Sequence, residues 1–237
     1  MKIQKITNRN ILFTANESAT GTVTTGLIKG KAHNFIIDTG TGGDFSKAML
    51  DYLADDSLST IVINTHHHWD HVYGNWMFKD KQIIAHKLCM ELLDNDWTKK
   101  IEEVSARGAI LHGEVHKYLP NRLIDAPLHF PEDGVLIFLN PGHSVDSISV
   151  YDEIDKVIYL GDNFGIDEED KDICYWGYED TEADEMASEE EVDARYDASF
   201  FEMMKYLNKY DFESAVLSHG GHVSRADFLK LEEDFKD

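Results

Sequence analysis

The sequence predicts an α/β or α+β sandwich with its helices on the outside. Short runs of β-forming residues recur along the 237 residues, and helical patterns fall between several of them and after them. The strand runs come first in each half of the chain, and the helices come later. We expect residues 1–237 to form one domain, because α/β and all-β architectures of this length often do.

Each predicted strand is a short run rich in Ile, Val, Leu, Phe or Thr. In chain order the runs are "ILF" at 11–13, "TVTTGLI" at 22–28, "HNFIID" at 33–38, "TIVIN" at 60–64, "QIIA" at 82–85, "VLIFL" at 135–139, "SISVY" at 147–151, "KVIYL" at 156–160 and "AVLS" at 215–218.

Two helices are predicted near the C-terminus. In "EEEVDARYDASFFEMMKYLNKY", at 189–210, apolar residues recur at mostly four-residue steps, which predicts an amphipathic helix; they are Val192, Tyr196, Phe200, Met204 and Leu207. A last helix is expected to begin at Ser224, an N-cap residue with Asp227 three positions on.

Composition excludes several classes of function. The formal charge of −23 would repel a nucleic acid backbone. No apolar stretch is long enough to cross a membrane, and the start "MKIQKITNRNILF" is too polar for a signal peptide, so we expect a cytoplasmic protein. Cys89 and Cys174 lie 85 positions apart without CxxC spacing, which favours a reducing compartment and argues against thiolate ligands.

An acidic segment at about 165–191 interrupts this pattern. Residues 167–191 hold thirteen Asp or Glu against one Lys, a net charge of −12. We interpret the segment as a solvated surface excursion.

A dense set of possible metal ligands follows the run "TIVI". The stretch "NTHHHWDH", at 64–71, contains four histidines and one aspartate. Imidazole and carboxylate are ligands that zinc, iron and manganese accept. If a strand leads into a loop here, His66 and His68 point to one side and His67 to the other, while Asp70 and His71 can face a second ion.

This stretch resembles the His-x-His-x-Asp-His signature of the metallo-β-lactamase superfamily. Other parts of the chain are similar to further motifs of that family, so the resemblance runs from about residue 22 to 222; these parts are "NFIIDTG" at 34–40, "NPGHSVDSISVYDEIDKVIYLGD" at 140–162 and "AVLSHGG" at 215–221. The resemblance implies an αββα sandwich, in which two mixed β-sheets carry helices on their outer faces.

The resemblance also implies two divalent metal ions, zinc first, with iron or manganese as alternatives. It assigns His66, His68 and His143 to the first ion. It assigns Asp70, His71 and His219 to the second, with Asp162 between the two. Asp38 is expected to accept hydrogen bonds beneath the site.

Hydrolysis by a metal-bridging hydroxide is the reaction this site predicts, with Asp70 as a catalytic residue. The substrate is expected to be a small ester, lactone, thioester or phosphoester. Some relatives fit poorly: only 18 residues follow His219, too few for the helical extension of the glyoxalase II type, and the secreted β-lactamases need an export signal. An iron-dependent persulfide dioxygenase of the same fold stays open as the alternative.

Four residues are weaker candidates for substrate contacts. The acidic segment holds Tyr175, Trp176 and Tyr178, which predict either a lid that binds a cationic group or an interface, for instance in a homodimer. In "SHGGH", His219 directly follows a strand and is the expected ligand. His222 lies beyond two glycines and is left as a substrate-facing or supporting residue.

Overall fold

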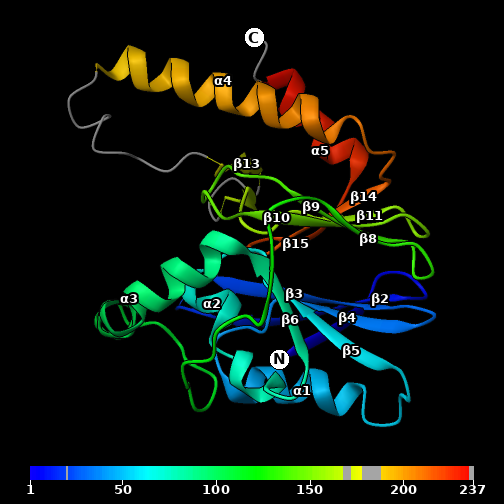
Figure 1. The fold of residues 1–237 in the computed structure, drawn as a ribbon. Coiled ribbons are helices and arrows are strands. Elements are labelled where there is room, and N and C mark those ends of the chain that lie inside the picture. The colour runs from blue at the N-terminus through cyan, green and yellow to red at the C-terminus, as the bar shows by residue number, and fades with distance from the viewer. Residues whose placement is uncertain (20, 168–171, 178–187, 235–237) are drawn as a thin grey trace.

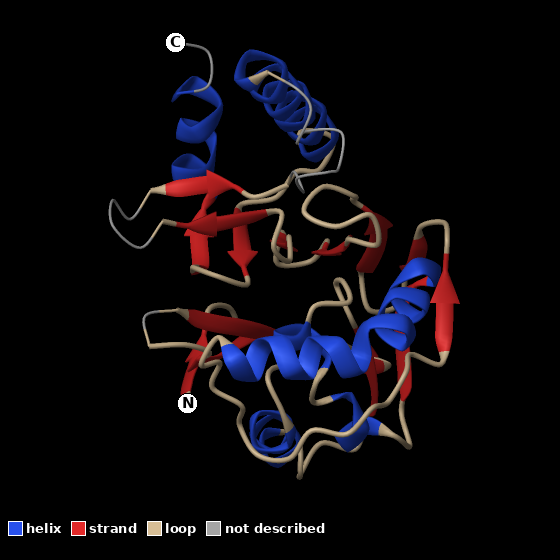
Figure 2. Ribbon diagram, turned by 90° about the vertical axis from the view of Figure 1, so that its left-hand side faces the viewer, coloured by secondary structure: helices blue, strands red, loops and turns tan. Residues whose placement is uncertain are grey.

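Two β-sheets pack face to face in the computed structural model, with helices on both outer faces (Figure 1; Figure 2). The structure describes residues 1–19, 21–167, 172–177 and 188–234. The predicted αββα sandwich is confirmed.

The first sheet comes from the N-terminal half of the chain. Its seven strands lie side by side in chain order: β1 (Lys2–Lys5), β2 (Asn10–Asn16), β3 (Thr22–Lys29), β4 (His33–Ile37), β5 (Ser59–Ile63), β6 (Gln82–His86) and β7 (Arg122–Ile124). Neighbouring strands are antiparallel from β1 to β4 and parallel from β4 to β7. The sheet is therefore mixed.

The second sheet comes from the C-terminal half. Its order is β15 (Gly221–Ser224), β14 (Ser214–Leu217), β11 (Val157–Tyr159), β10 (Ile148–Asp152), β9 (Val135–Leu139) and β8 (Leu128–Phe130). Only the β11–β14 pair is parallel. A small hairpin of β12 (Phe164–Ile166) and β13 (Ile173–Tyr175) lies beside it, and Gly165 forms a bridge with His219.

Helices cover both outer faces. On the first sheet lie α1 (Gly43–Tyr52), the short α2 (Trp69–Val72), the 3₁₀ turn η1 (Asn75–Phe78) and the long α3 (Lys87–Ala106), while α4 (Glu189–Leu207) and α5 (Arg225–Asp234) cover the second (Figure 1). Phe45 and Met49 of α1 pack on the first sheet, and Phe200 and Leu207 of α4 pack on the second. The same spacing of four residues or so that predicts α4 thus produces its buried face.

Between the sheets lies an aliphatic core to which both contribute. Leu12, Ile61 and Ile63 of the first sheet meet Ile137 and Val150 of the second, all buried. Burial of these side chains away from water is the main force that holds the two halves together.

Several polar contacts cross between the two halves of the sandwich. Asn10 donates to the buried Asp152 at 2.7 Å and accepts from the Tyr159 hydroxyl at 2.8 Å. Asp133, in the turn before β9, accepts from the backbone N–H groups of residues 31–33.

Most of the predicted elements are found. Each predicted strand run overlaps an observed strand, although five of the runs extend one residue beyond an end of it, and α5 begins after Ser224, whose hydroxyl accepts from the Asp227 N–H. The sequence missed β1, β7, β8, β12, β13 and β15, which are three or four residues long. Runs this short leave too little apolar pattern to recognise.

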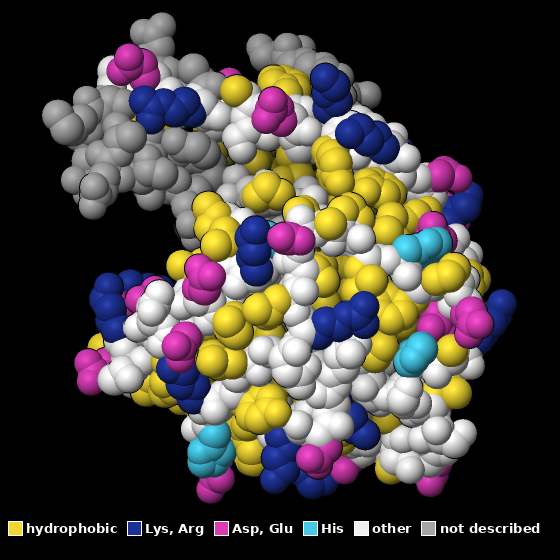
Figure 3. All heavy atoms as spheres, in the orientation of Figure 1, with side chains coloured by type: hydrophobic (Ala, Val, Ile, Leu, Met, Phe, Trp, Pro, Cys, Tyr) yellow, Lys and Arg dark blue, Asp and Glu magenta, His cyan; other side chains and the backbone are white. Residues whose placement is uncertain are grey.

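No helix in the described part of the chain has the length and apolarity to cross a membrane. On the face seen in Figure 3, basic side chains of the described residues are spread out with acidic ones among them.

Candidate metal centre

The predicted ligands follow the C-terminal ends of four strands. Residues 66–71 lie just after β5, His143 follows β9, Asp162 follows β11, and His219 follows β14. In the second sheet these three strands run in the same direction, since β9 and β11 are both antiparallel to β10 and β14 is parallel to β11. Their ends therefore meet at one edge, opposite the loop from the first sheet.

The first cluster contains His66, His68, His143 and Asp162, whose ligand atoms all lie within 4.8 Å of one another. His143 Nε2 is 3.1 Å from His68 Nδ1 and 3.7 Å from Asp162 Oδ2. His66 Nε2 is 3.5 Å from the same carboxylate oxygen.

The second cluster contains Asp70, His71, His219 and again Asp162. His71 Nε2 lies 3.3 Å from Asp70 Oδ2 and 3.2 Å from Asp162 Oδ1. His219 Nε2 lies 3.2 Å from Asp70 Oδ2 and 3.3 Å from Asp162 Oδ2. Asp162 thus faces both clusters.

These spacings fit metal ions. Ligands bonded at about 2.0–2.1 Å to one tetrahedral ion lie roughly 3.3–3.4 Å apart, which is close to the observed distances. One inward-facing atom, His66 Nε2, is buried and has no hydrogen-bond partner among the described residues. Buried polar atoms rarely stay unpaired, so the residues present suit a pair of bound ions.

The protonation of the first cluster favours binding. Burial, together with the neighbouring histidines, lowers the pKa of His66 well below its ordinary value. Burial and the adjacent His143 lower the pKa of His68 to about 3. Both imidazoles are therefore neutral at pH 7, which is the form that binds a metal ion.

In the second cluster opposite charges balance one another. Burial acts against charge at His71 and His219, but Asp162 and Asp70 outweigh it and raise the pKa of both histidines well above the ordinary value. Burial raises the pKa of both carboxyls, but the same histidines outweigh it and hold the pKa of Asp70 and Asp162 well below its usual range. An ion that enters this cluster therefore displaces protons.

Two further carboxylates fix the outer nitrogens of ligands. Asp38 Oδ2 is 2.8 Å from His71 Nδ1, and Asp38 also accepts from the Thr65 N–H and hydroxyl, so its expected supporting role is confirmed. Glu17 Oε1 is 2.9 Å from His219 Nδ1, and the Thr22 carbonyl is 3.0 Å from the same nitrogen. Both partners of that nitrogen are acceptors, so it keeps a proton, and Nε2 is the nitrogen that would bind an ion once its own proton is displaced.

Sequence reasoning missed Glu17. It lies at the end of the β2–β3 hairpin, far from every ligand in the sequence, and nothing in its local pattern marks it.

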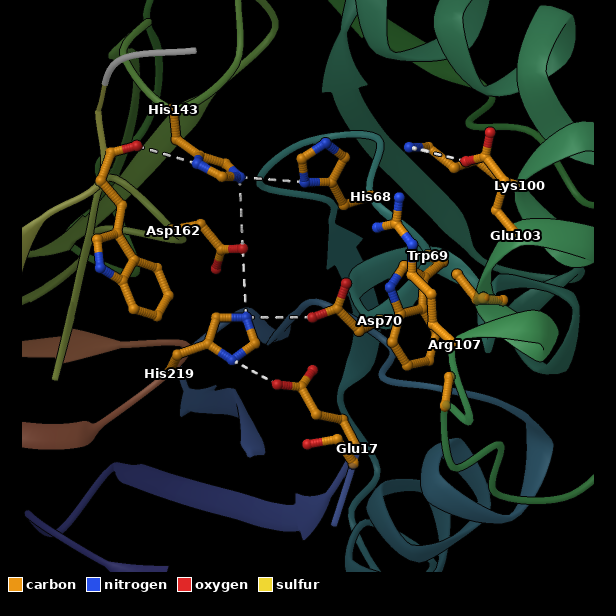
Figure 4. A pocket seen from close by; sticks show the side chains of 14 residues that line it. Glu17, His68, Trp69, Asp70, Lys100, Glu103, Arg107, His143, Asp162 and His219 are labelled. Carbon is orange, nitrogen blue, oxygen red and sulfur yellow. Dashed lines mark hydrogen bonds and ion pairs between the residues drawn. The ribbon is translucent and has the colours of Figure 1, made fainter. Parts of the chain in front are cut away.

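A pocket of about 360 Å³ opens over the two clusters (Figure 4). Five of the predicted ligands line the pocket, together with residues of the β2–β3 hairpin, of α2, of α3 and the loop after it, and Trp176. The full lining is Glu17, Ser18, His68, Trp69, Asp70, Lys100, Glu103, Val104, Arg107, Ala109, His143, Asp162, Trp176 and His219. The ligands lie on one side and the α3 side chains on the other (Figure 4).

The candidate substrate residues separate in the structure. Trp176 lines the pocket, and its carbonyl oxygen is 3.0 Å from His143 Nδ1. Tyr175 does not: it is 2% exposed and packs against Phe164 and Phe200, because alternate residues of β13 face opposite sides. The prediction that Tyr175 contacts substrate is therefore wrong, and Tyr178 lies outside the described residues.

His222, which the sequence left as a substrate-facing or supporting residue, also lies away from the site. It is exposed on β15 and lines a separate groove beside Asp172 and Lys230. The turn at Gly220 and Gly221, both with positive φ, reverses the chain after His219 and leads His222 away from the metal clusters.

Comparisons with known proteins agree with this geometry. The family model for the metallo-beta-lactamase superfamily matches residues 19–215. No curated protein matches the chain significantly.

Among solved structures, the DIM-1 metallo-beta-lactamase has a TM-score of 0.71 at 14% identity, covering 99% of this chain and 96% of that one. A metallo-beta-lactamase from Pontibacter korlensis has a TM-score of 0.70 at 16% identity, covering 100% and 99%. One from Hirschia baltica has a TM-score of 0.65 at 14% identity, covering 99% and 97%. These structures share the fold, and the matched family model shows that the chain belongs to the metallo-beta-lactamase superfamily.

Proposed function

We propose that the protein is a dinuclear metallo-hydrolase that cleaves a small ester, lactone, thioester or phosphoester. The observation that carries the proposal is the sharing of Asp162 between two clusters whose ligand atoms have metal-like spacing and face one pocket. A pocket of about 360 Å³ suits a small molecule rather than a polymer.

Zinc is the first candidate for both positions. The ligands are imidazoles and carboxylates without thiolate, which zinc accepts and which manganese and iron also tolerate. Bound there, two divalent ions would supply Lewis acidity and a hydroxide nucleophile near neutral pH.

The chain's own residues complete the chemistry. Asp70, which is 4% exposed and lines the pocket, orients the attacking water and accepts its proton. Trp69, Val104 and Trp176 supply apolar walls that limit the entry of bulk water.

The test combines metal content with turnover. The purified protein, reconstituted with excess Zn²⁺, Mn²⁺ or Fe²⁺, should hold two ions per chain by elemental analysis. Each form is then assayed on ester, lactone, thioester, phosphoester and persulfide panels. Hydrolysis that depends on the metal supports the proposal. No more than one ion per chain defeats the dinuclear centre, and oxygen-dependent turnover of persulfides alone, by the iron form, would replace hydrolysis with dioxygenation.

A further inference from the structure

One wall of the pocket carries positive charge. Lys100, Glu103 and Arg107 lie three to four positions apart at the C-terminal end of α3, so their side chains share one face of the helix. All three line the pocket across from the metal ligands (Figure 4). Two basic residues here stand out in a chain of net charge −23.

The acidic groups of the pocket already have partners. Asp70 and Asp162 face the ligand histidines, and Glu17 contacts His219. Glu103 lies 3.6 Å from the Lys100 ammonium, which offsets part of that charge.

Arg107 differs from these groups. Its guanidinium has no ion pair or side-chain hydrogen bond among the described residues, and it is exposed at the pocket rim. A guanidinium offers a planar fork of N–H donors that matches a carboxylate or a phosphoryl group.

We propose that Arg107, assisted by Lys100, binds an anionic group of the substrate, a carboxylate or a phosphoryl, while the bond to be cleaved lies at the metal centre. This inference rests on the proposed function, whose substrate class it narrows. This anionic group is opposite in charge to the cationic group that the sequence of the acidic segment at about 165–191 led us to expect. Trp69 and Val104 line the pocket beside the basic pair, so the part of the substrate that joins its two ends is apolar.

The local charge also has a selective effect. The strongly acidic surface repels anions in general, whereas the basic pair attracts one at a single point inside the pocket. Neutral esters that reach the metal centre lack this contact, so the anionic group distinguishes the preferred substrate from them.

The experiment uses zinc-loaded full-length protein and three probes that share a metal-binding hydroxamate. Their tails are two methylene groups long and end in a methyl group (butanohydroxamate), a carboxylate (succinic monohydroxamate) or a phosphonate. Dissociation constants are measured by calorimetry, which needs no turnover. The variants are Arg107→Gln, the conservative Arg107→Lys, Glu103→Gln, and Lys87→Gln as a matched loss of charge at the far end of α3.

An anionic probe should bind more tightly than the methyl probe, and the tighter of the two anions names the preferred group. Arg107→Gln should weaken that probe about ten-fold, the scale of a partly exposed charge-assisted contact, with the methyl probe unchanged. Arg107→Lys should restore part of the loss. Glu103→Gln should strengthen anion binding, and Lys87→Gln should leave it unchanged.

The subsite is overturned if no anionic probe binds more tightly than the methyl probe, or if Lys87→Gln weakens binding as much as Arg107→Gln does. Failure of the proposed function looks different. If the metal-loaded wild type turned over none of the substrate panels but still bound the anionic probes more tightly, the proposed hydrolase function would be refuted and the anion subsite would stand.

Discussion

His67 Nδ1 lies 2.9 Å from Asp146 Oδ1, and this pair joins the two loops that carry the first metal cluster. Asp146 is fully buried, and the Ser144 hydroxyl donates to the same oxygen. His67 therefore points away from the first candidate cluster, as alternation along "HHH" predicts, and holds the loop of His143 against the loop of His66.

Replacing His67 separates structural support from metal binding. His67→Ala should keep both ions and most activity, but the fold should lose about 1–3 kcal/mol because Asp146 stays buried with fewer partners. His68→Ala should lose at least one ion. Metal analysis and urea unfolding of the zinc-loaded variants measure both effects. His129→Ala, which removes an exposed pair with Glu153, is the control. Equal metal loss from the two loop variants would contradict this geometry.

His219 and His222 provide a second paired test. His219→Ala should weaken binding of the second ion by about ten-fold or more, since even the loss of a residue that only hydrogen-bonds to a ligand has effects of that size. His222→Ala should leave both ions bound, because its side chain lies in another groove. Competition with a chelator gives the affinities. The opposite ranking would mean that the register of the loop after β14 is wrong.

Glu17→Gln should weaken binding of the second ion by about ten-fold and leave binding of the first ion unchanged. The amide keeps the size of the side chain but loses the charge that orients the His219 ring through a 2.9 Å contact. Stepwise zinc titration resolves the two sites. Glu132→Gln, an exposed substitution of the same kind, serves as the control. Equal weakening of both ions would show that Glu17 acts through the general field rather than through His219.

Because of Asp133, the free energy of unfolding should fall as the pH is lowered into the acid range. Burial raises its pKa, but three backbone N–H groups and His33 outweigh burial, so the folded pKa lies below the ordinary value of 3.8. A depressed folded pKa gives stability that is present above the unfolded pKa and is lost as pH falls through the folded one. Between pH of about 5 and about 3, the wild type should therefore lose more free energy of unfolding than Asp133→Asn. Urea unfolding across that range checks this, and parallel losses would refute it.

Gly26→Ala should push the two sheets apart. A Cβ at this position would lie 2.3 Å from Cε1 of Tyr159, whose ring packs against β3 from the other sheet. Overpacking of this kind costs about 1–3 kcal/mol. Thermal unfolding should show the loss, and a variant as stable as the wild type would show that the sheets can adjust freely.

The sequence predicts best where the chemistry is local. Residues 66–71 lie together in the sequence, and the strands that precede His143, Asp162 and His219 are apolar runs, so both could be recognised. That these residues bind metal ions is still a prediction. Glu17, Lys100 and Arg107 could not be found in this way, because only the packing of the hairpin and of α3 brings them to the pocket. Tyr175 was misassigned because its direction depends on pairing in a three-residue strand.

The shared edge of the two sheets also sets an order of events during biosynthesis. Residues 66–71 leave the ribosome long before His219, and neither cluster is complete until the second sheet has docked on the first. A nascent chain that has released only the first sheet therefore presents residues 66–71 without the members of either cluster that the second sheet supplies.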